Sequence, residues 1–314
     1  MKATFWMKSV DETEIYVEKW FEESKEPKAI VQIAHGMTEH IQRYHDFVQF
    51  LVRNGIYVYG NDHRGHGKTG QKQELMGYFS EADGFEKTTN DLHQITQLIK
   101  KAYPDKPIFL LGHSMGSFLS RNYIQTYASD IAGVILSGTG YYPKATATFG
   151  KLLASRLSPK KKSPFMNKLA FGTFNRKIIN QKTPFDWLTR DDAVVQAYLE
   201  DSLCGYIPTA RFFFDLMTGL LWIHSPERNN QIRKDLPMFI ISGDQDPVGN
   251  YGKGVWKTAS MYKSLGIEHI TVSLIEGARH EVLNEINKEE IYEEILNWII
   301  KQIATYFSSK AVSK

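Results

Sequence analysis

A serine at position 114 lies between two glycines in a pattern that can build a nucleophile. Residues Gly112–Gly116 read G-H-S-M-G, follow the short apolar run Ile108–Leu111 and precede apolar residues at helical spacing. A serine on a sharp turn between a strand and a helix presents its hydroxyl at the end of a sheet, and flanking glycines permit that turn. We therefore expect Ser114 to be a nucleophile, the alternative being a chance glycine-serine turn.

A serine hydroxyl needs a base to take its proton, and the base needs a carboxylate to orient it. Two predicted strands downstream end in turns that offer both groups. Met238–Ser242 runs into Asp244 and Asp246, and Ile270–Ile275 runs into a turn that holds His280. Because both turns follow the carboxyl ends of their strands, we expect them at the same edge of the sheet as the nucleophile.

The base is easier to choose than the acid. His280 is preferred because His269 precedes a strand and His224 lies in a segment without strand patterns. Asp246 is favoured as the acid, and Asp244 is expected to stabilise the loop through its backbone. The residues alone leave both aspartates open.

Acyl transfer also requires N–H donors aimed at the developing oxyanion. The backbone N–H of Met115, directly after the nucleophile, is one expected donor. The second is expected from the loop after the predicted strand Ile30–Ala34, where Gly36 permits a sharp turn that would aim the N–H of Met37 at the site. His35, in the same loop, is expected to be a buried structural histidine.

The order of elements predicts an α/β fold with a mostly parallel central sheet and helices on both faces. Short apolar runs typical of strands buried on both faces alternate with amphipathic helical patterns, and two segments at the start resemble an antiparallel pair. These strands are Ala3–Trp6, Ile15–Phe21, Ile30–Ala34, Ile56–Gly60, Ile108–Leu111, Gly133–Ser137, Met238–Ser242 and Ile270–Ile275.

The alternation stops in residues 141–230, which are rich in aromatic residues and helical in pattern. We expect this segment to be a helical cap inserted into a core formed by residues 1–140 and 231–314. Ligands bind outside the carboxyl ends of strands in open α/β sheets, so such a cap could line an apolar tunnel to the nucleophile. Most of its aromatic residues are expected to fill the cap itself, and only a few to touch substrate.

Composition limits the partners of the chain. Its 314 residues carry 38 lysines and arginines against 35 acidic residues, a balance that does not favour nucleic acid. The one cysteine, Cys204, and the lack of an apolar leader favour a cytoplasmic location. The basic run at residues 159–164 is expected to be a solvated loop, with transient contact to an anionic membrane surface as the alternative.

No cofactor and no metal are expected. Residues 62–67 contain two histidines and an aspartate, but they lack the spacing of a zinc site, and their glycines suit a loop at the exit of a strand.

With these motifs in hand, the sequence resembles the monoacylglycerol lipase and lysophospholipase group of α/β-hydrolase serine hydrolases. The motifs that carry the resemblance are residues 35–40 with 43–44, 62–67, 112–116, 243–246 and 277–280. The resemblance implies an α/β-hydrolase fold with a helical cap after the sixth strand. It also implies that Asp246 is the acid, and that Met37 and Met115 supply the oxyanion donors.

The expected substrate is a monoacylglycerol or a similar single-chain lipid ester. A lysophospholipase or a general carboxylesterase is the nearest alternative. A phosphate-bearing head group would favour basic side chains near the mouth of the site, and the sequence does not locate Lys144, Lys151 or Arg211 there. Oligomeric state is left open.

Two further functions are weighed against this one. An aminopeptidase needs a carboxylate to capture the free amine of its substrate, which Asp186, Asp191, Asp192 or Glu200 could supply. A ligand receptor without catalysis is disfavoured by a serine, an acid and a histidine in the chain order of α/β-hydrolases.

Overall fold

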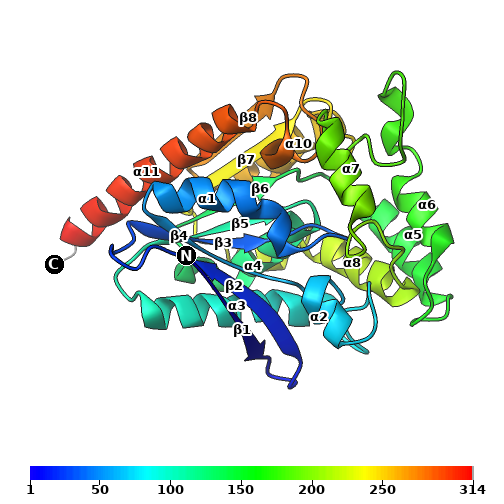
Figure 1. Ribbon diagram of the computed structural model, residues 1–314, viewed down its shortest axis with the longest axis horizontal. Coiled ribbons are helices and arrows are strands. Elements are labelled where there is room, and N and C mark those ends of the chain that lie inside the picture. Colours follow the sequence, from blue (N-terminus) through cyan, green and yellow to red (C-terminus); the bar gives the residue numbers. More distant parts are fainter. Residues whose placement is uncertain (313–314) are drawn as a thin grey trace.

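A sheet of eight strands forms the centre of the computed structural model, which describes residues 1–312, with side chains through residue 308 (Figure 1). Its order is β1-β2-β4-β3-β5-β6-β7-β8. The strands are β1 (Lys2–Lys8), β2 (Glu14–Trp20), β3 (Ala29–Ala34), β4 (Ile56–Asn61), β5 (Ile108–His113), β6 (Gly133–Ser137), β7 (Met238–Gly243) and β8 (Ile270–Ile275).

Strands β3 to β8 run parallel, while β1 and β2 add an antiparallel pair at one edge. In the register of the sheet, Ala34 of β3 lies opposite Gly112 of β5, and His113 lies opposite Ser137 of β6. The loops after these strands therefore leave the sheet at one edge. This arrangement confirms the predicted α/β class and the parallel sheet.

Helices cover both faces of the sheet. One face packs against α1 and α11 through residues such as Leu51 and Ile295, and the other against α3, α4 and α10 through residues such as Ile95 and Tyr123. These elements of the core are η1 (Ile41–Tyr44), α1 (His45–Arg53), α2 (Gly67–Lys72), α3 (Gly84–Ala102), α4 (Met115–Tyr127), η2 (Ala128–Asp130), α10 (Lys253–Ser264), η4 (Val282–Asn284) and α11 (Lys288–Val312).

The burial of β8 differs from the sequence expectation of a strand covered on both faces. Its residues are mostly half-buried, because β8 is the last strand of the sheet and pairs only with β7. Ala102 and Thr126 lie in the last turns of α3 and α4 and are exposed, whereas earlier residues of the same helices, such as Ile95 and Tyr123, are buried. No helix in the described part of the chain combines the length and apolar character needed to cross a bilayer.

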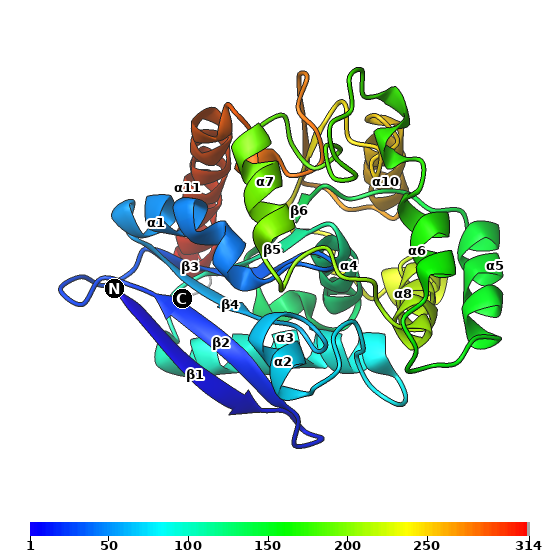
Figure 2. The ribbon, with the colours of Figure 1, turned by 45° about the vertical axis from the view of Figure 1, so that its right-hand side comes forward.

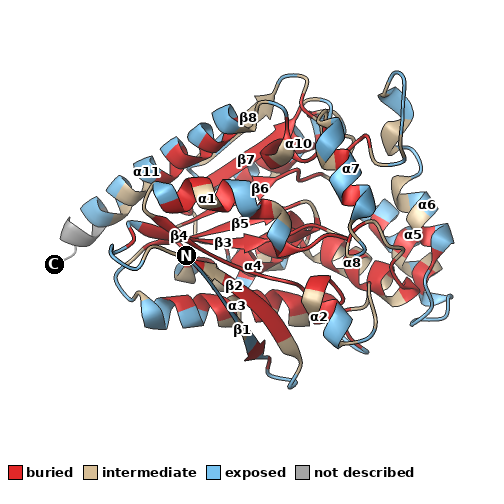
Figure 3. Cartoon of the chain, viewed as in Figure 1, coloured by how far each residue is buried: buried red, intermediate tan, exposed pale blue. Residues whose placement is uncertain are grey.

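Residues 141–230, here called the cap segment, lie between β6 and β7. They contain α5 (Lys144–Ser155), α6 (Pro164–Phe171), η3 (Phe174–Lys177), α7 (Asp192–Glu200), α8 (Ala210–Trp222) and α9 (Pro226–Asn229). Helices α5, α6 and α8 gather at one end of the sheet, on the right of Figure 1, and in the rotated view α7 lies apart from them, toward α1 (Figure 2). Helix α8 is largely buried, whereas α5 and α6 expose much of their surface (Figure 3).

Candidate active site

Ser114 lies on the turn between β5 and α4 with a backbone conformation of φ 52° and ψ −118°. A positive φ is uncommon for a residue other than glycine and costs free energy that the surrounding structure must supply. The backbone N–H of Ser114 donates to Ser137 O at 2.9 Å, which ties the turn to the neighbouring strand β6. This is the strained strand-to-helix turn that the sequence motif predicts.

The two glycines of the motif are required by close packing. A Cβ atom on Gly116 would lie 1.9 Å from Ala34 O, and one on Gly112 would lie 2.3 Å from Ser120 Oγ. The first turn of α4 therefore packs directly against the end of β3. This contact brings the start of α4 beside the loop that follows β3.

The structure brings Asp246 and His280 together. His280 Nδ1 lies 3.0 Å from Asp246 Oδ1, and both side chains are buried. Asp246 Oδ1 also accepts the N–H of Val248 at 2.8 Å, while its Oδ2 accepts the hydroxyl of Ser242 at 3.0 Å. Asp246 is therefore held on both oxygens, and its acceptor atom fixes Nδ1 of His280 as the protonated nitrogen.

The other aspartate of the turn has a different partner. Asp244 Oδ1 accepts the backbone N–H of Gly277 at 2.8 Å and so joins the two turns that carry Asp246 and His280.

Burial alone would lower the pKa of His280, because the charged imidazolium is desolvated. The negative charge of Asp246 and its hydrogen bond outweigh burial, so the pKa of His280 is raised above its usual value. The imidazole is thus a stronger base than a histidine in water. Such a shift suits a group that must accept a proton from a hydroxyl.

Ser114 and His280 line the same cavity. Among the described residues, Ser114 Oγ makes no hydrogen bond to the His280 ring. In enzymes without substrate, such bonds are often long or poorly aligned and tighten only in the complex.

The loop after β3 lies against the serine. A Cβ atom on Gly36 would be 3.3 Å from the Cβ of Ser114. Within the described part of the chain, the backbone N–H groups of Met37 and Met115 have no hydrogen-bond acceptor. Both residues line the cavities at the serine. Two free N–H groups beside a serine could bind an anionic oxygen.

The predicted structural role of His35 is confirmed. His35 Nε2 accepts the backbone N–H of His63 at 3.0 Å, and its Nδ1 lies 2.7 Å from Gly36 O. Burial and the neighbouring His63 lower the pKa of His35, so the ring is neutral. It holds the loop after β3 against the loop after β4.

A buried ionic cluster that the sequence does not predict links this loop to the histidine turn. Arg43 donates two hydrogen bonds to Glu281, from Nη1 at 2.5 Å and from Nη2 at 2.7 Å. Its Nη1 also donates to Glu39 at 2.7 Å. Glu39 also accepts the N–H of Gly36 and the hydroxyl of Tyr44. Burial disfavours the charge on Glu281, but Arg43 outweighs it and lowers the pKa of Glu281 to about 2. The signal in the sequence was two charged residues inside a recognised motif, Glu39 and Arg43, and a third, Glu281, directly after the histidine turn.

The cap segment is hydrogen-bonded to both the loop after β3 and the histidine turn, mostly through its backbone. Thr38 O accepts hydrogen bonds from Gly205 N and from the hydroxyl of Tyr198, each at 3.0 Å. On the other side, the N–H of Glu281 donates to Leu188 O at 2.7 Å, and that of His280 to a neighbouring cap carbonyl. Residues 187–205 of the cap segment are therefore part of the site.

Two cavities meet at Ser114. One, of about 240 Å³, is almost wholly apolar and lies among α4, α5, α6 and α8; its lining includes Phe118, Ala147 and Leu220. The other, of about 490 Å³, is more polar and includes Asn167 and Gln181. More aromatic residues of the cap segment line these cavities than the sequence leads us to expect: Tyr142, Phe149, Phe171, Phe174, Phe185, Trp187, Tyr198 and Tyr206.

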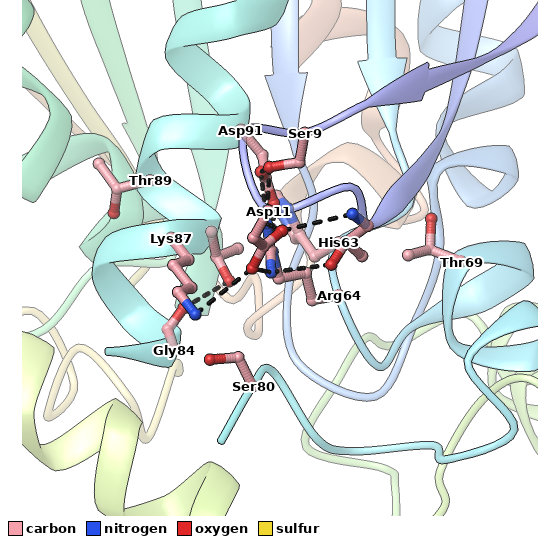
Figure 4. Close-up of polar contacts among 12 residues, drawn as sticks. Ser9, Asp11, His63, Arg64, Thr69, Ser80, Gly84, Lys87, Thr89 and Asp91 are labelled. Atoms are coloured by element: carbon pink, nitrogen blue, oxygen red, sulfur yellow. Dashed lines mark hydrogen bonds and ion pairs between the residues drawn. The ribbon is translucent and has the colours of Figure 1, made fainter. Parts of the chain in front are cut away.

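The loop at residues 62–67 is tied down by hydrogen bonds and ion pairs of its own. Arg64 lies between Asp91 and Asp11, with Nε 2.7 Å from Asp91 and Nη1 2.7 Å from Asp11 (Figure 4). Asp62 accepts the backbone N–H groups of Ile41 and Lys68 at 2.9 and 2.7 Å. These contacts fit the expected loop at the exit of a strand.

One group of described residues has donor atoms close enough to hold a metal ion. The donor atoms of His40, Asp201 and Cys204 lie within 4.8 Å of one another. His40 Nε2 is already bonded to Asp201 Oδ2 at 2.7 Å, and burial raises the pKa of the Cys204 thiol. Metals bind the thiolate, so the raised pKa opposes binding here. We interpret this group as a contact between the core and the cap segment.

The chain is similar to proteins of known name over most of its length. It is 27% identical over 285 residues to a monoacylglycerol lipase of Mycolicibacterium smegmatis, covering 88% of this chain and 90% of that one. It is 24% identical to the human monoglyceride lipase, covering 89% and 84% of the two chains. A crystal structure of a thermostable carboxyl esterase from Bacillus coagulans, in complex with glycerol, superposes with a TM-score of 0.89 at 28% identity, covering 96% and 99% of the chains.

Residues 25–287 match the Hydrolase_4 family, described as serine aminopeptidase, S33. The matched region includes every turn described above, from the loop after β3 to the histidine turn. With the eight-stranded sheet and the strained turn at Ser114, this match confirms the resemblance seen in the sequence: the chain belongs to the Hydrolase_4 family of serine hydrolases with the α/β-hydrolase fold.

Proposed function

We propose that this protein is a serine carboxylic ester hydrolase that acts on single-chain lipid esters, with monoacylglycerol as the reference substrate. The observation that carries the proposal is the meeting of two unlike cavities at Ser114. The apolar cavity suits an acyl chain, and the polar cavity suits the alcohol that leaves. An ester with one long chain and a small polar alcohol matches this pair of cavities.

In the proposed mechanism, Ser114 Oγ attacks the ester carbonyl while His280 Nε2 takes its proton. The N–H groups of Met37 and Met115 stabilise the oxyanion, and Asp246 stabilises the imidazolium. The C–O bond to the alcohol then breaks, and His280 returns the proton to the leaving oxygen. Water, activated by His280, releases the fatty acid from Ser114.

The relatives support this substrate class. Proteins named monoacylglycerol lipase and monoglyceride lipase align over most of this chain. A carboxyl esterase shares its fold at 28% identity.

An aminopeptidase activity finds less support. Asp186 accepts hydrogen bonds from residues 182 and 183, and Asp191 caps α7. Asp192 pairs with a lysine, and Glu200 with a glutamine. None of the four lines either cavity at Ser114. The carboxylates that do line the polar cavity already bind Arg43.

We further propose that the exposed side of the cap segment contacts lipid surfaces. Phe149, Leu152, Phe165 and Leu169 expose large apolar side chains on α5 and α6. The exposed lysines at 160–162 lie in the loop between these helices. An apolar patch beside lysines suits an anionic membrane surface. Sedimentation with anionic vesicles tests this: binding that survives replacement of all three lysines by glutamine would exclude a role for the loop.

The proposed function is tested by fatty-acid release from a long-chain monoacylglycerol, compared with a short-chain nitrophenyl ester. Ser114→Ala is the control and should lose roughly six orders of magnitude in kcat on the scale of other serine hydrolases. Activity on the short ester without release from monoacylglycerol would keep the mechanism and reject the substrate. Activity that survives in Ser114→Ala would reject the mechanism.

A further inference from the structure

The polar cavity carries a charge pattern that a neutral glycerol does not require. Of the lysine and arginine side chains that the structure describes, only Lys168 on α6 and Arg176 in η3 line it. Both are exposed, and neither has an ion-pair partner among the described residues. Two cations without anionic partners therefore stand at the wall of the cavity that receives the leaving alcohol.

The two carboxylates that line the same cavity are paired with an arginine and not with Lys168 or Arg176. Glu39 and Glu281 are buried side chains of its lining and bind Arg43, which lies between them. Their hydrogen bonds to backbone and side-chain donors use the remaining oxygen positions. An anionic group would thus be repelled by this carboxylate pair and attracted by Lys168 and Arg176 of the cap segment.

Lys144, Lys151 and Arg211 do not contribute positive charge to the wall of this cavity. Arg211 pairs with Asp215, and Lys151 lies 4.8 Å from the centre of the Phe214 ring. Neither these two nor Lys144 lines either cavity.

We infer that the polar cavity is a subsite for an anionic phosphate on the glycerol of the substrate, with Lys168 and Arg176 as its recognition residues. The inference rests on the proposed function, since it gives the leaving alcohol of the same reaction. The substrate class is then a monoacylglycerol that carries a phosphate at its free end, such as a lysophosphatidate. The acyl chain lies in the apolar cavity, and the leaving group is a glycerol phosphate that takes its proton from His280. Polar residues such as Asn167 and Gln181 contact the glycerol between the two ends.

The first test compares kcat/KM for a lysophosphatidate and for the monoacylglycerol of the same chain, both below their critical micelle concentrations. The readout is the ratio of the two values in the wild type and in Lys168→Gln/Arg176→Gln. We expect the ratio to fall by about tenfold in the double variant, as two partly exposed charge contacts would give. Added salt should reduce the wild-type ratio and leave that of the variant almost unchanged.

A charge-matched control is Lys101→Gln/Lys263→Gln, which removes two exposed cations from α3 and α10, away from both cavities. Its ratio should equal that of the wild type. An equal fall in this control would mean that net charge acts, and it would overturn the subsite. A ratio that does not change in the Lys168 and Arg176 variant would overturn it as well.

A binding experiment separates failure of the subsite from failure of the proposed function. Ether analogues, in which the ester is replaced by an ether, cannot be hydrolysed, and their dissociation constants can be measured on Ser114→Ala. We expect 1-O-alkylglycerol 3-phosphate to bind more tightly than 1-O-alkylglycerol, and the difference to vanish when Lys168 and Arg176 are replaced. If wild-type enzyme releases no fatty acid but this difference is found, the subsite stands and the reaction is wrong. If monoacylglycerol is hydrolysed and the difference is absent, the reaction stands and the subsite is wrong.

Discussion

Replacing Asp246 by asparagine should separate the effect of its charge from the effect of its hydrogen bonds. Asp246 Oδ1 faces two donors, the N–H of Val248 and Nδ1 of His280, whereas Oδ2 faces a hydroxyl that can also accept. An asparagine fits this pattern in one orientation only, with its oxygen at Oδ1 and its NH₂ toward Ser242. The variant should therefore keep the orientation and tautomer of His280 and lose only the charge.

The size of the loss follows from the spacing of the two groups. The nearest atoms of the two groups are 3.0 Å apart, but both charges are delocalised. Taken as unit charges about 4 Å apart, they interact by about 4 kcal/mol at an effective dielectric constant of about 20. The imidazolium that forms in the transition state loses this attraction in Asp246→Asn. We therefore expect kcat to fall about 10³-fold.

The pH dependence gives an independent check. His280 acts as a base only when neutral, so activity falls as the pH drops through its pKa. Asp246 raises that pKa in the wild type. In Asp246→Asn the pKa falls, and the acid limb of kcat/KM should therefore move to lower pH.

Asp244→Asn is the matched control. Its amide oxygen can still accept the N–H of Gly277, so activity should stay within about threefold of the wild type. Both variants would be assayed on a short nitrophenyl ester, with thermal denaturation to establish that they are folded. A larger loss in Asp244→Asn than in Asp246→Asn, or a loss under about tenfold in Asp246→Asn, would refute this reasoning.

Three further substitutions test other parts of the site. Arg43→Gln leaves two buried carboxylates without their cation and should reduce the free energy of unfolding by about 3 kcal/mol or more, measured by denaturant titration; unchanged stability would show that the cluster is dispensable. Gly116→Ala puts a methyl group 1.9 Å from Ala34 O and should lower both the melting temperature and kcat; a variant with wild-type values of both would disprove the tight contact of α4 with β3. Ala147→Phe fills the apolar cavity and should lower kcat/KM for long-chain esters at least about tenfold relative to short ones. The reason is that several CH₂ groups of the acyl chain lose their buried site, each worth about 0.8 kcal/mol. Equal losses for both esters would place the acyl chain elsewhere.

The sequence carried enough local information to predict the strands and the turns at their ends. Apolar runs such as Ile108–Leu111 have few alternative structures when a glycine-rich turn follows, and the strained turn at Ser114 lies where the motif predicts it. The burial of each strand was harder to predict, because it depends on which strands lie at the edges of the sheet. β8 has the same apolar pattern as the inner strands, yet it has only one neighbour.

Contacts between distant segments could not be predicted from local patterns. Arg43 and Glu281 meet although 238 positions separate them. Lys168 and Arg176 are ordinary surface residues in the sequence, and only the folded cap segment brings them to the wall of a cavity beside Ser114. Such pairings depend on the whole topology of the chain and not on local propensity.

The hydrogen bonds from Tyr198 and Gly205 to Thr38 O have a consequence for protein engineering. They fix the second half of the cap segment to the loop after β3, which carries the proposed oxyanion donor Met37. Exchange of residues 141–230 as one module between relatives would disrupt these hydrogen bonds, and we expect the chimera to hydrolyse every ester more slowly. Exchange of α5 and α6 alone keeps these hydrogen bonds. A preference for acyl-chain length could therefore be transferred with these two helices while the proposed active site is preserved.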